Sequence, residues 1–136
     1  MSLTVFITGA TSGIGKATAE FLAQHNYRLI LCGRNKEQLL NLEKSLGKQT
    51  DLITLQFDVR NKNDVFNSIE SLPEDFRNID VLINNAGNAH GLSFIQDGDT
   101  NDWDAMLDIN VKGLLYVSKA ILPKMIERNT GFIVNI

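Results

Sequence analysis

The feature that most constrains the fold of this chain is a regular alternation of short apolar runs with longer segments of helical spacing. The apolar runs are rich in β-branched residues and predict strands: LTVFIT at 3–8, RLILC at 28–32, LITLQF at 52–57, VLIN at 81–84 and GFIVNI at 131–136. They are continuously apolar, which indicates a sheet covered on both faces. Strands alternating with helices in this way predict a parallel, doubly wound α/β sheet of about five strands.

The segments between the runs have amphipathic patterns. After the first run, one helical face collects Ile14, Ala17, Thr18, Phe21, Leu22 and His25. The next two segments have the same spacing, at Leu39, Leu42 and Leu46 and then at Val65, Phe66, Ile69 and Leu72. Asn35 is the expected N-cap of the second helix and Gly47 its end. The long stretch 102–128 is expected to split into two helices near Lys112–Gly113, with a local bend at Pro123.

The length and net charge of the chain limit the number of domains and the classes of molecule that it is expected to bind. With 136 residues and no linker or repeat, we expect one domain spanning 1–136. A net charge of −3 without a basic cluster argues against nucleic acid and anionic membranes, and no apolar run approaches the length of a membrane span. The first predicted strand leaves no room for a signal peptide, so we expect a cytoplasmic protein. Cys32 is expected to be a buried thiol, and the aspartates at 97–104 lack the frame of a calcium loop, so no metal is expected.

A glycine-rich turn, TGATSGIGKAT at 8–18, joins the first strand to the first helix. A nucleoside-triphosphate P-loop fails here, because Ala17 replaces the metal-binding hydroxyl and Ala10 replaces a required glycine. Glycines at 9, 13 and 15 instead suit a tight reversal, close approach to a pyrophosphate, and close packing of the helix on the strand. The residues of this turn expected to form the cofactor-binding site are Gly9, Thr11, Ser12, Gly13, Ile14 and Gly15.

The end of the second strand indicates which dinucleotide would bind. An NAD site places an acid there for the ribose 2′-hydroxyl, but this strand ends in CGRN at 32–35. Arg34, with Asn35 beside it, stands where a guanidinium would pair with a 2′-phosphate. We therefore predict NADP(H) as the cofactor; an FMN-binding flavodoxin-like domain is the other fold of this size, and the glycine spacing disfavours it.

Four motifs in register resemble the short-chain dehydrogenases/reductases: TGATSGIG at 8–15, DV at 58–59, NNAG at 84–87 and NVKG at 110–113. The resemblance covers the whole chain and implies a Rossmann-type sheet. It also implies that Asp58 accepts from the adenine amino group beside Val59, and that Asn85, Ala86 and Gly87 pass close to the adenosine ribose. Asn110 would position a water in the proton path, and Asn84 would steady the strand ends. Within the superfamily, the stretches 72–91 and 122–136 resemble the NADP-dependent 3-hydroxy acid and serine dehydrogenases.

The family's tyrosine–lysine pair and serine are not found in these residues. Tyr27 is followed four positions later by Leu31, and Tyr116 by Ala120. We therefore expect an incomplete Rossmann domain, the N-terminal part of an NADP(H)-dependent oxidoreductase of about twice this length, with the C-terminal catalytic part absent. The resemblance implies hydride transfer to or from a small hydroxy or keto substrate, such as a 3-hydroxy acid, and a homo-oligomer paired through 112–128. The alternative is an NADP(H)-binding module, or an inactive fragment, without catalysis.

Overall fold

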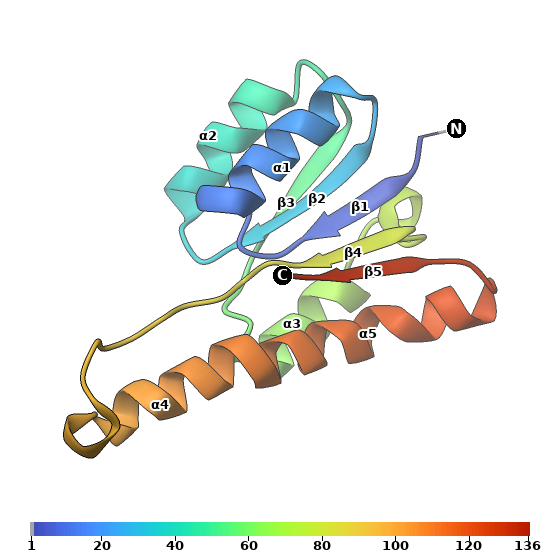
Figure 1. The fold of residues 1–136 in the computed structure, drawn as a ribbon. Helices are drawn as coiled ribbons and strands as arrows, with labels where there is room; N and C mark the ends of the chain where they lie inside the picture. The colour runs from blue at the N-terminus through green and yellow to red at the C-terminus, as the bar shows by residue number, and fades with distance from the viewer. Residues whose placement is uncertain (1) are drawn as a thin grey trace.

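The computed structural model describes residues 2–136 and contains one five-stranded, fully parallel sheet in the order β3-β2-β1-β4-β5 (Figure 1). The strands are β1 Thr4–Ile7, β2 Arg28–Gly33, β3 Leu52–Gln56, β4 Val81–Asn84 and β5 Phe132–Asn135. The predicted strands and the parallel sheet are confirmed, with ends that shift by at most one residue. The strand order changes direction at β1, because β2 and β3 lie on one side of it and β4 and β5 on the other. In open α/β sheets, that switch point opens a crevice at the carboxyl ends of the strands.

Helices cover both faces of the sheet, as the continuously apolar strands predicted. The helices α1 Gly13–Gln24 and α2 Lys36–Leu46 lie on one face, and α3 Lys62–Glu70 and α5 Leu114–Glu127 lie on the other (Figure 1). Alternate residues of β1 point to the two faces of the sheet and pack in the core on each face. Val5 and Ile7 belong to the core with Ala19 and Leu42, and Phe6 belongs to the core with Val65, Val117 and Ile121.

The amphipathic face predicted for α1 is wrong. Gly15, Ala19 and Ala23 are the buried residues of this helix, whereas Ile14 and Phe21 are 61% and 60% exposed. Small side chains let the helix lie close to the sheet, and the larger apolar residues are left on its outer side. There the ring of Phe21 stacks on His25 with a centroid distance of 4.2 Å.

The prediction that the long stretch 102–128 breaks into two separate helices near Lys112–Gly113 is also wrong. The helix α4, Thr100–Leu107, continues into α5 through a π-helical segment, Asp108–Gly113. The helix therefore widens by an extra residue in this turn and does not end there. A side chain at Gly113 would collide with Val59. This contact lets the π segment lie against the chain after β3. Pro123 lies inside α5 without ending it.

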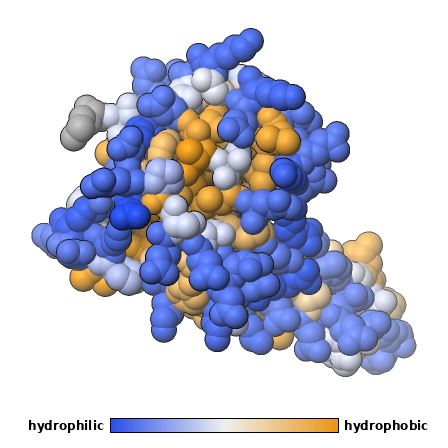
Figure 2. Space-filling model, turned by 180° about the vertical axis from the view of Figure 1, so that it is seen from behind, coloured by the Kyte–Doolittle hydropathy of each residue, from blue (hydrophilic) through white to orange (hydrophobic). Residues whose placement is uncertain are grey.

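The loop after β4 and the start of α4 project from the body of the molecule (Figure 1). Leu92, Phe94 and Ile95 are exposed apolar residues of this projection. Seen from behind, apolar residues also gather in the middle of the main body, with hydrophilic residues around them (Figure 2).

Polar side chains fasten the sheet at both ends of its strands. At the amino ends, Asp80 accepts from Thr4 N at 2.9 Å and from an Nη of Arg128 at 3.2 Å. Near the carboxyl ends, Nδ2 of buried Asn84 donates to Ser118 Oγ at 3.1 Å and to Asn135 Oδ1 at 2.9 Å. These bonds join β4 to β5 and α5, as predicted for Asn84.

Candidate functional site

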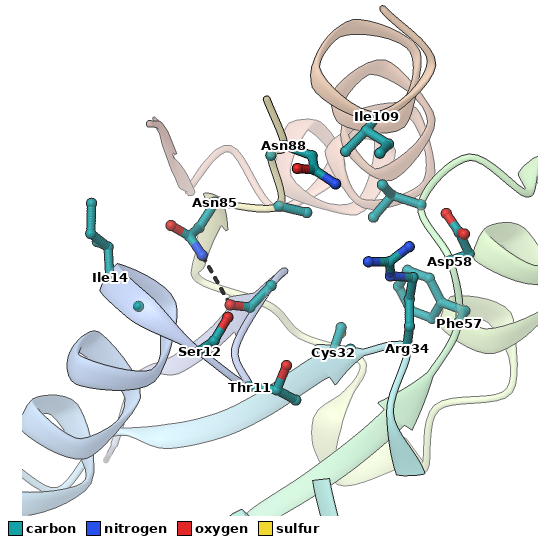
Figure 3. A pocket seen from close by; sticks show the side chains of 16 residues that line it. Thr11, Ser12, Ile14, Cys32, Arg34, Phe57, Asp58, Asn85, Asn88 and Ile109 are labelled. Atoms are coloured by element: carbon teal, nitrogen blue, oxygen red, sulfur yellow. Dashed lines mark hydrogen bonds between the residues drawn. The ribbon is translucent and has the colours of Figure 1, made fainter. Parts of the chain in front are cut away.

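The carboxyl ends of the strands border a cavity of about 300 Å³, called the carboxyl-end cavity below (Figure 3). The structure brings together in its lining every residue predicted to bind the cofactor except Gly15 and Asn35: Gly9, Thr11, Ser12, Gly13, Ile14, Arg34, Asp58, Val59, Asn85, Ala86 and Gly87. Cys32, Gly33, Phe57, Asn88 and Ile109 also line it and were not predicted. The first three of these could have been found from the sequence, because they stand at strand ends beside predicted residues.

The glycine-rich turn has the backbone geometry that its sequence predicted. Gly9 and Gly13 adopt φ angles of +63° and +55°, which favour glycine. A Cβ on Gly9 would stand 3.0 Å from Ala86 Cα, whereas a Cβ on Gly13 would point into open space. A Cβ on Gly15 would collide with the Gly9 carbonyl and with Nδ2 of Asn85. Gly15 therefore acts through packing behind the wall of the cavity.

The turn is locked to the end of β4 by Thr8 and Asn85. The hydroxyl of Thr8 accepts from the backbone N–H groups of Asn85 and Ala86 at 3.0 and 2.9 Å. In return, Nδ2 of Asn85 donates to the carbonyl of Thr8 at 3.1 Å. It also donates to the carbonyl of Gly9 at 3.0 Å (Figure 3). The side-chain amide of Asn85 thus joins the turn to the end of β4, and Asn85 also lines the cavity.

The N-terminus of α1 differs from those of the next helices. The side chains of Asn35, Asn61 and Asp99 cap α2, α3 and α4, whereas Ser12 makes no side-chain capping bond to α1. Ser12 also lines the cavity. The positive end of the α1 dipole therefore faces this space without a side-chain cap, which favours an anion there.

Arg34 reaches from the end of β2 into the cavity, and its guanidinium lies toward Phe57 and Asp58 (Figure 3). The side chain is exposed, and no ion pair involving it is present within residues 2–136. Asn35 does not line the cavity. Its Oδ1 accepts from Gln38 N at 3.1 Å, which confirms it as the N-cap of α2.

The negative charge of Asp58 is stabilised by Arg60, a partner that was not predicted from the sequence. Its Oδ2 is 2.7 Å from an Nη of Arg60, and its Oδ1 accepts from Arg60 N at 3.0 Å. The hydrogen bonds from the Arg60 side chain lower the pKa of Asp58 and outweigh its partial burial. The carboxylate is therefore ionised at neutral pH. The Asp-x-Arg spacing after a strand was the available signal, because it permits a side chain to bond the backbone two residues on.

Asn110 lies in the π segment, outside the lining of the cavity. Its Oδ1 accepts from Asn88 N and its Nδ2 donates to Asn88 O, each at 2.8 Å. This reciprocal pair holds the loop after β4 against the helix. Sequence reasoning singled out Asn110 but did not find its partner.

Of the remaining candidate groups, Tyr27, Tyr116 and His90 lie outside the cavity. Tyr27 precedes β2, at the opposite end of the sheet from the cavity, and Tyr116 packs against the core of the α3–α5 side. His90 does not line the cavity. Cys32 is buried, as predicted, and this burial raises the pKa of its thiol. In the part of the chain that the structure describes, no cluster of three potential metal-ligating side chains is present. Over the same residues, no helix combines the length and apolar character needed to cross a membrane.

Comparison with known proteins places the chain among the dehydrogenases. The family model described as short chain dehydrogenase matches residues 3–136. The NADP-dependent 3-hydroxy acid dehydrogenase YdfG of Salmonella typhi is 43% identical over 132 residues, which cover 97% of this chain and 52% of that protein. The chain thus spans about half the length of the curated relatives it matches.

Solved structures show the same arrangement of elements. The closed form of serine dehydrogenase complexed with NADP+ is 40% identical, with a TM-score of 0.91 over 98% of this chain and 53% of that one. NAD+-bound xylitol dehydrogenase is 35% identical, with a TM-score of 0.93 over 98% of this chain and 52% of that one. Both nicotinamide dinucleotides therefore occur among proteins of this fold.

Proposed function

Because the chain belongs to the short-chain dehydrogenase family, we propose that its 136 residues form the NADP(H)-binding domain of an oxidoreductase. The observation that carries the choice of cofactor is Arg34, whose free guanidinium enters the carboxyl-end cavity from the strand end where NAD-binding domains place an acid. The dehydrogenase of Salmonella typhi named as NADP-dependent and the NADP+ complex of serine dehydrogenase support this choice.

The residues of the cavity fit a dinucleotide. Gly9 and Gly13 bring backbone close to the place of a pyrophosphate, and the uncapped N-terminus of α1 favours its charge. Thr11, Ser12 and Ile14 complete that turn. Arg34 would hold the 2′-phosphate, and Asn35 would fix the strand end by capping α2. Asp58 and Val59 would hold the adenine, and the backbone of Asn85, Ala86 and Gly87 would hold its ribose.

When bound, the nicotinamide supplies a hydride donor or acceptor. We propose that the substrate is a small hydroxy or keto compound, and that a 3-hydroxy acid is the first class to test, since the 43%-identical relative is named for it. Asn110 remains the residue of this chain proposed for the proton path. Its amide bonds to Asn88 would fix the π segment that borders this side of the site.

The second candidate is cofactor binding without turnover by these 136 residues. The placement of Tyr27 and Tyr116 away from the cavity favours it, since neither phenol could exchange a proton with a substrate bound there. We propose that the chain binds NADP(H), and that turnover by the oxidoreductase requires a tyrosine–lysine pair that this sequence does not contain.

Fluorescence titration with NADPH and NADH tests the cofactor, and an absorbance assay with NADP+ and L-serine or other 3-hydroxy acids tests turnover. We expect tighter binding of NADPH and no reduction of NADP+. Tighter binding of NADH would overturn the cofactor assignment. Reduction of NADP+ that disappears when Arg34 is replaced would overturn the proposal of binding without turnover.

We also propose that the chain pairs with a second copy through α4 and α5. Leu107, Val111, Leu115, Leu122 and Ile126 are exposed and recur at helical spacing along this continuous helix. Such a stripe is apolar surface that a helix from a partner would bury. Light scattering after size exclusion should give twice the mass of 15.1 kDa, and Leu115→Glu should return the monomer.

A further inference from the structure

Asp58 separates two hollows. One is the carboxyl-end cavity, and the other is an open hollow lined by Arg60, Asn61, Lys62 and Asn63. Arg60 approaches Asp58 from the second side, and it is absent from the lining of the cavity. The Asp58 carboxylate, with its side chain 27% exposed, is therefore shared between a cation outside the cavity and whatever enters the cavity.

The contacts from Arg60 engage both oxygens of Asp58. Nε lies 3.1 Å from each oxygen, an Nη lies 2.7 Å from Oδ2, and the backbone N–H donates to Oδ1 at 3.0 Å. A forked guanidinium bonded in this way fixes the orientation of a carboxylate and cancels its charge. The backbone bond spans only two residues, so the arrangement is local and does not depend on a distant element.

Arg34 needs this arrangement if it is to bind a phosphate. Arg34 and Asp58 line the same cavity, the guanidinium of Arg34 lies on the side of Asp58, and its charge contributes to the lowered pKa of Asp58. Within residues 2–136, Asp58 pairs with Arg60 and Arg34 forms no ion pair. Besides Arg60, Arg34 is the cation whose charge acts on the Asp58 carboxylate, so loss of Arg60 would leave Asp58 to attract Arg34. An unpaired carboxylate there would also repel an incoming phosphate.

We propose that Arg60 is a positioning residue that sets the preference for a 2′-phosphorylated cofactor from outside the cavity, by occupying Asp58 so that Arg34 stays free for the phosphate. This inference rests on the proposed binding of NADP(H) and deepens it. Arg34 contacts the 2′-phosphate, and the Asp58 carboxylate competes with that phosphate for the guanidinium of Arg34. Arg60 removes this competition by pairing with Asp58. The preference then depends on the sum of three charges, not on Arg34 alone.

A double-mutant cycle separates this role from simple attraction of the phosphate by Arg60. The probes are adenosine 2′,5′-bisphosphate and adenosine 5′-monophosphate, which differ only in the 2′-phosphate, measured by calorimetry on the 136-residue chain. The ratio of their affinities cancels any effect on adenine binding. The variants are Arg60→Gln, Asp58→Asn and the double variant. Lys62→Gln is the matched control, because it removes one positive charge from the same hollow, and no ion pair of Lys62 is present within residues 2–136.

We expect Arg60→Gln to lower the preference for the bisphosphate by about tenfold, the size of a lost charge-assisted bond. Asp58→Asn should preserve the preference, and the double variant should restore it, because no carboxylate then competes for Arg34. Lys62→Gln should leave it unchanged. A preference that survives Arg60→Gln would overturn the inference, as would a double variant as weak as Arg60→Gln, which would show direct attraction by Arg60. No preference in the unsubstituted chain would overturn the assignment of NADP(H) together with this inference, so the two failures are distinguishable.

Discussion

Replacing Gly15 by alanine adds one methyl group and should displace a whole wall of the carboxyl-end cavity. The new Cβ would overlap the Gly9 carbonyl and Nδ2 of Asn85, and neither can yield freely, because the two are joined by a hydrogen bond of 3.0 Å. Relief requires α1 to move away from the sheet, where Ala19 and Ala23 are buried. The substitution therefore disturbs the turn, the lock to β4 and the packing of α1 together.

The size of the effect follows from these contacts. Overpacking of a tight site costs about 1–3 kcal/mol, and weakening the bond from Asn85 to Gly9 costs about 1 kcal/mol more. The higher helix propensity of alanine returns up to about 1 kcal/mol. We expect a net loss of about 1–3 kcal/mol in the free energy of unfolding, measured as a lower urea midpoint with an unchanged m-value.

Two other substitutions make this prediction specific. Lys16→Ala changes an exposed residue of the same helix and should cost less than about 0.5 kcal/mol. Gly13→Asn places a side chain in open space at a positive φ that asparagine tolerates, so it should retain most of the stability and weaken NADPH binding. A Gly15→Ala variant as stable as Lys16→Ala, with NADPH affinity intact, would refute the argument from crowding.

Three further results are expected. Arg34→Asp should reverse the cofactor preference, so that NADH binds more tightly than NADPH in a fluorescence titration. Arg128→Met removes the partner of partly buried Asp80 and should lower stability by about 1–3 kcal/mol, seen as a lower midpoint in thermal or urea unfolding. Arg60→Gln should cost less than about 1 kcal/mol at pH 7, because its pair with Asp58 is partly exposed. Since Arg60 lowers the pKa of Asp58, that stabilisation is present above the ordinary value of 3.8 and is lost as the pH falls through the lowered pKa, so the urea midpoints of the variant and the unsubstituted chain should converge in acid.

The sheet could be predicted from the sequence because its signal is local and redundant. Each strand is a continuous apolar run, and at least one helix lies between each run and the next, so parallel pairing follows from the order of the elements. The ends shift by at most one residue, as at β3, where Phe57 belongs to the cavity lining and not to the strand.

The face of α1 could not be predicted from hydrophobic spacing, because two faces of this helix have helical spacing. One carries Ile14 and Phe21, which are larger and more apolar, and the other carries Gly15, Ala19 and Ala23. The contact between Gly15 and the Gly9 carbonyl decides between them, since only small residues allow the helix to begin so close to the strand. In this helix, steric fit to the turn outweighs the hydrophobic gain from burying larger side chains.

The candidate site likewise contains residues that the sequence could predict and residues that only the fold brings together. Gly13 and Arg34 were predictable because their places follow from strand ends, where a parallel sheet gathers residues from separate loops, whereas Asp58 was predicted from the family resemblance. The pairing of Asn110 with Asn88 was not predictable, because the π segment that aims this amide has no sequence signature. Arg60 is intermediate, since its bond to Asp58 is local, but its consequence depends on Arg34, which only the fold brings near. An acid in this cavity would argue against a phosphate if it were unpaired, whereas an acid bonded at both oxygens leaves the guanidinium free. The cofactor preference must therefore be inferred from which charges are already paired.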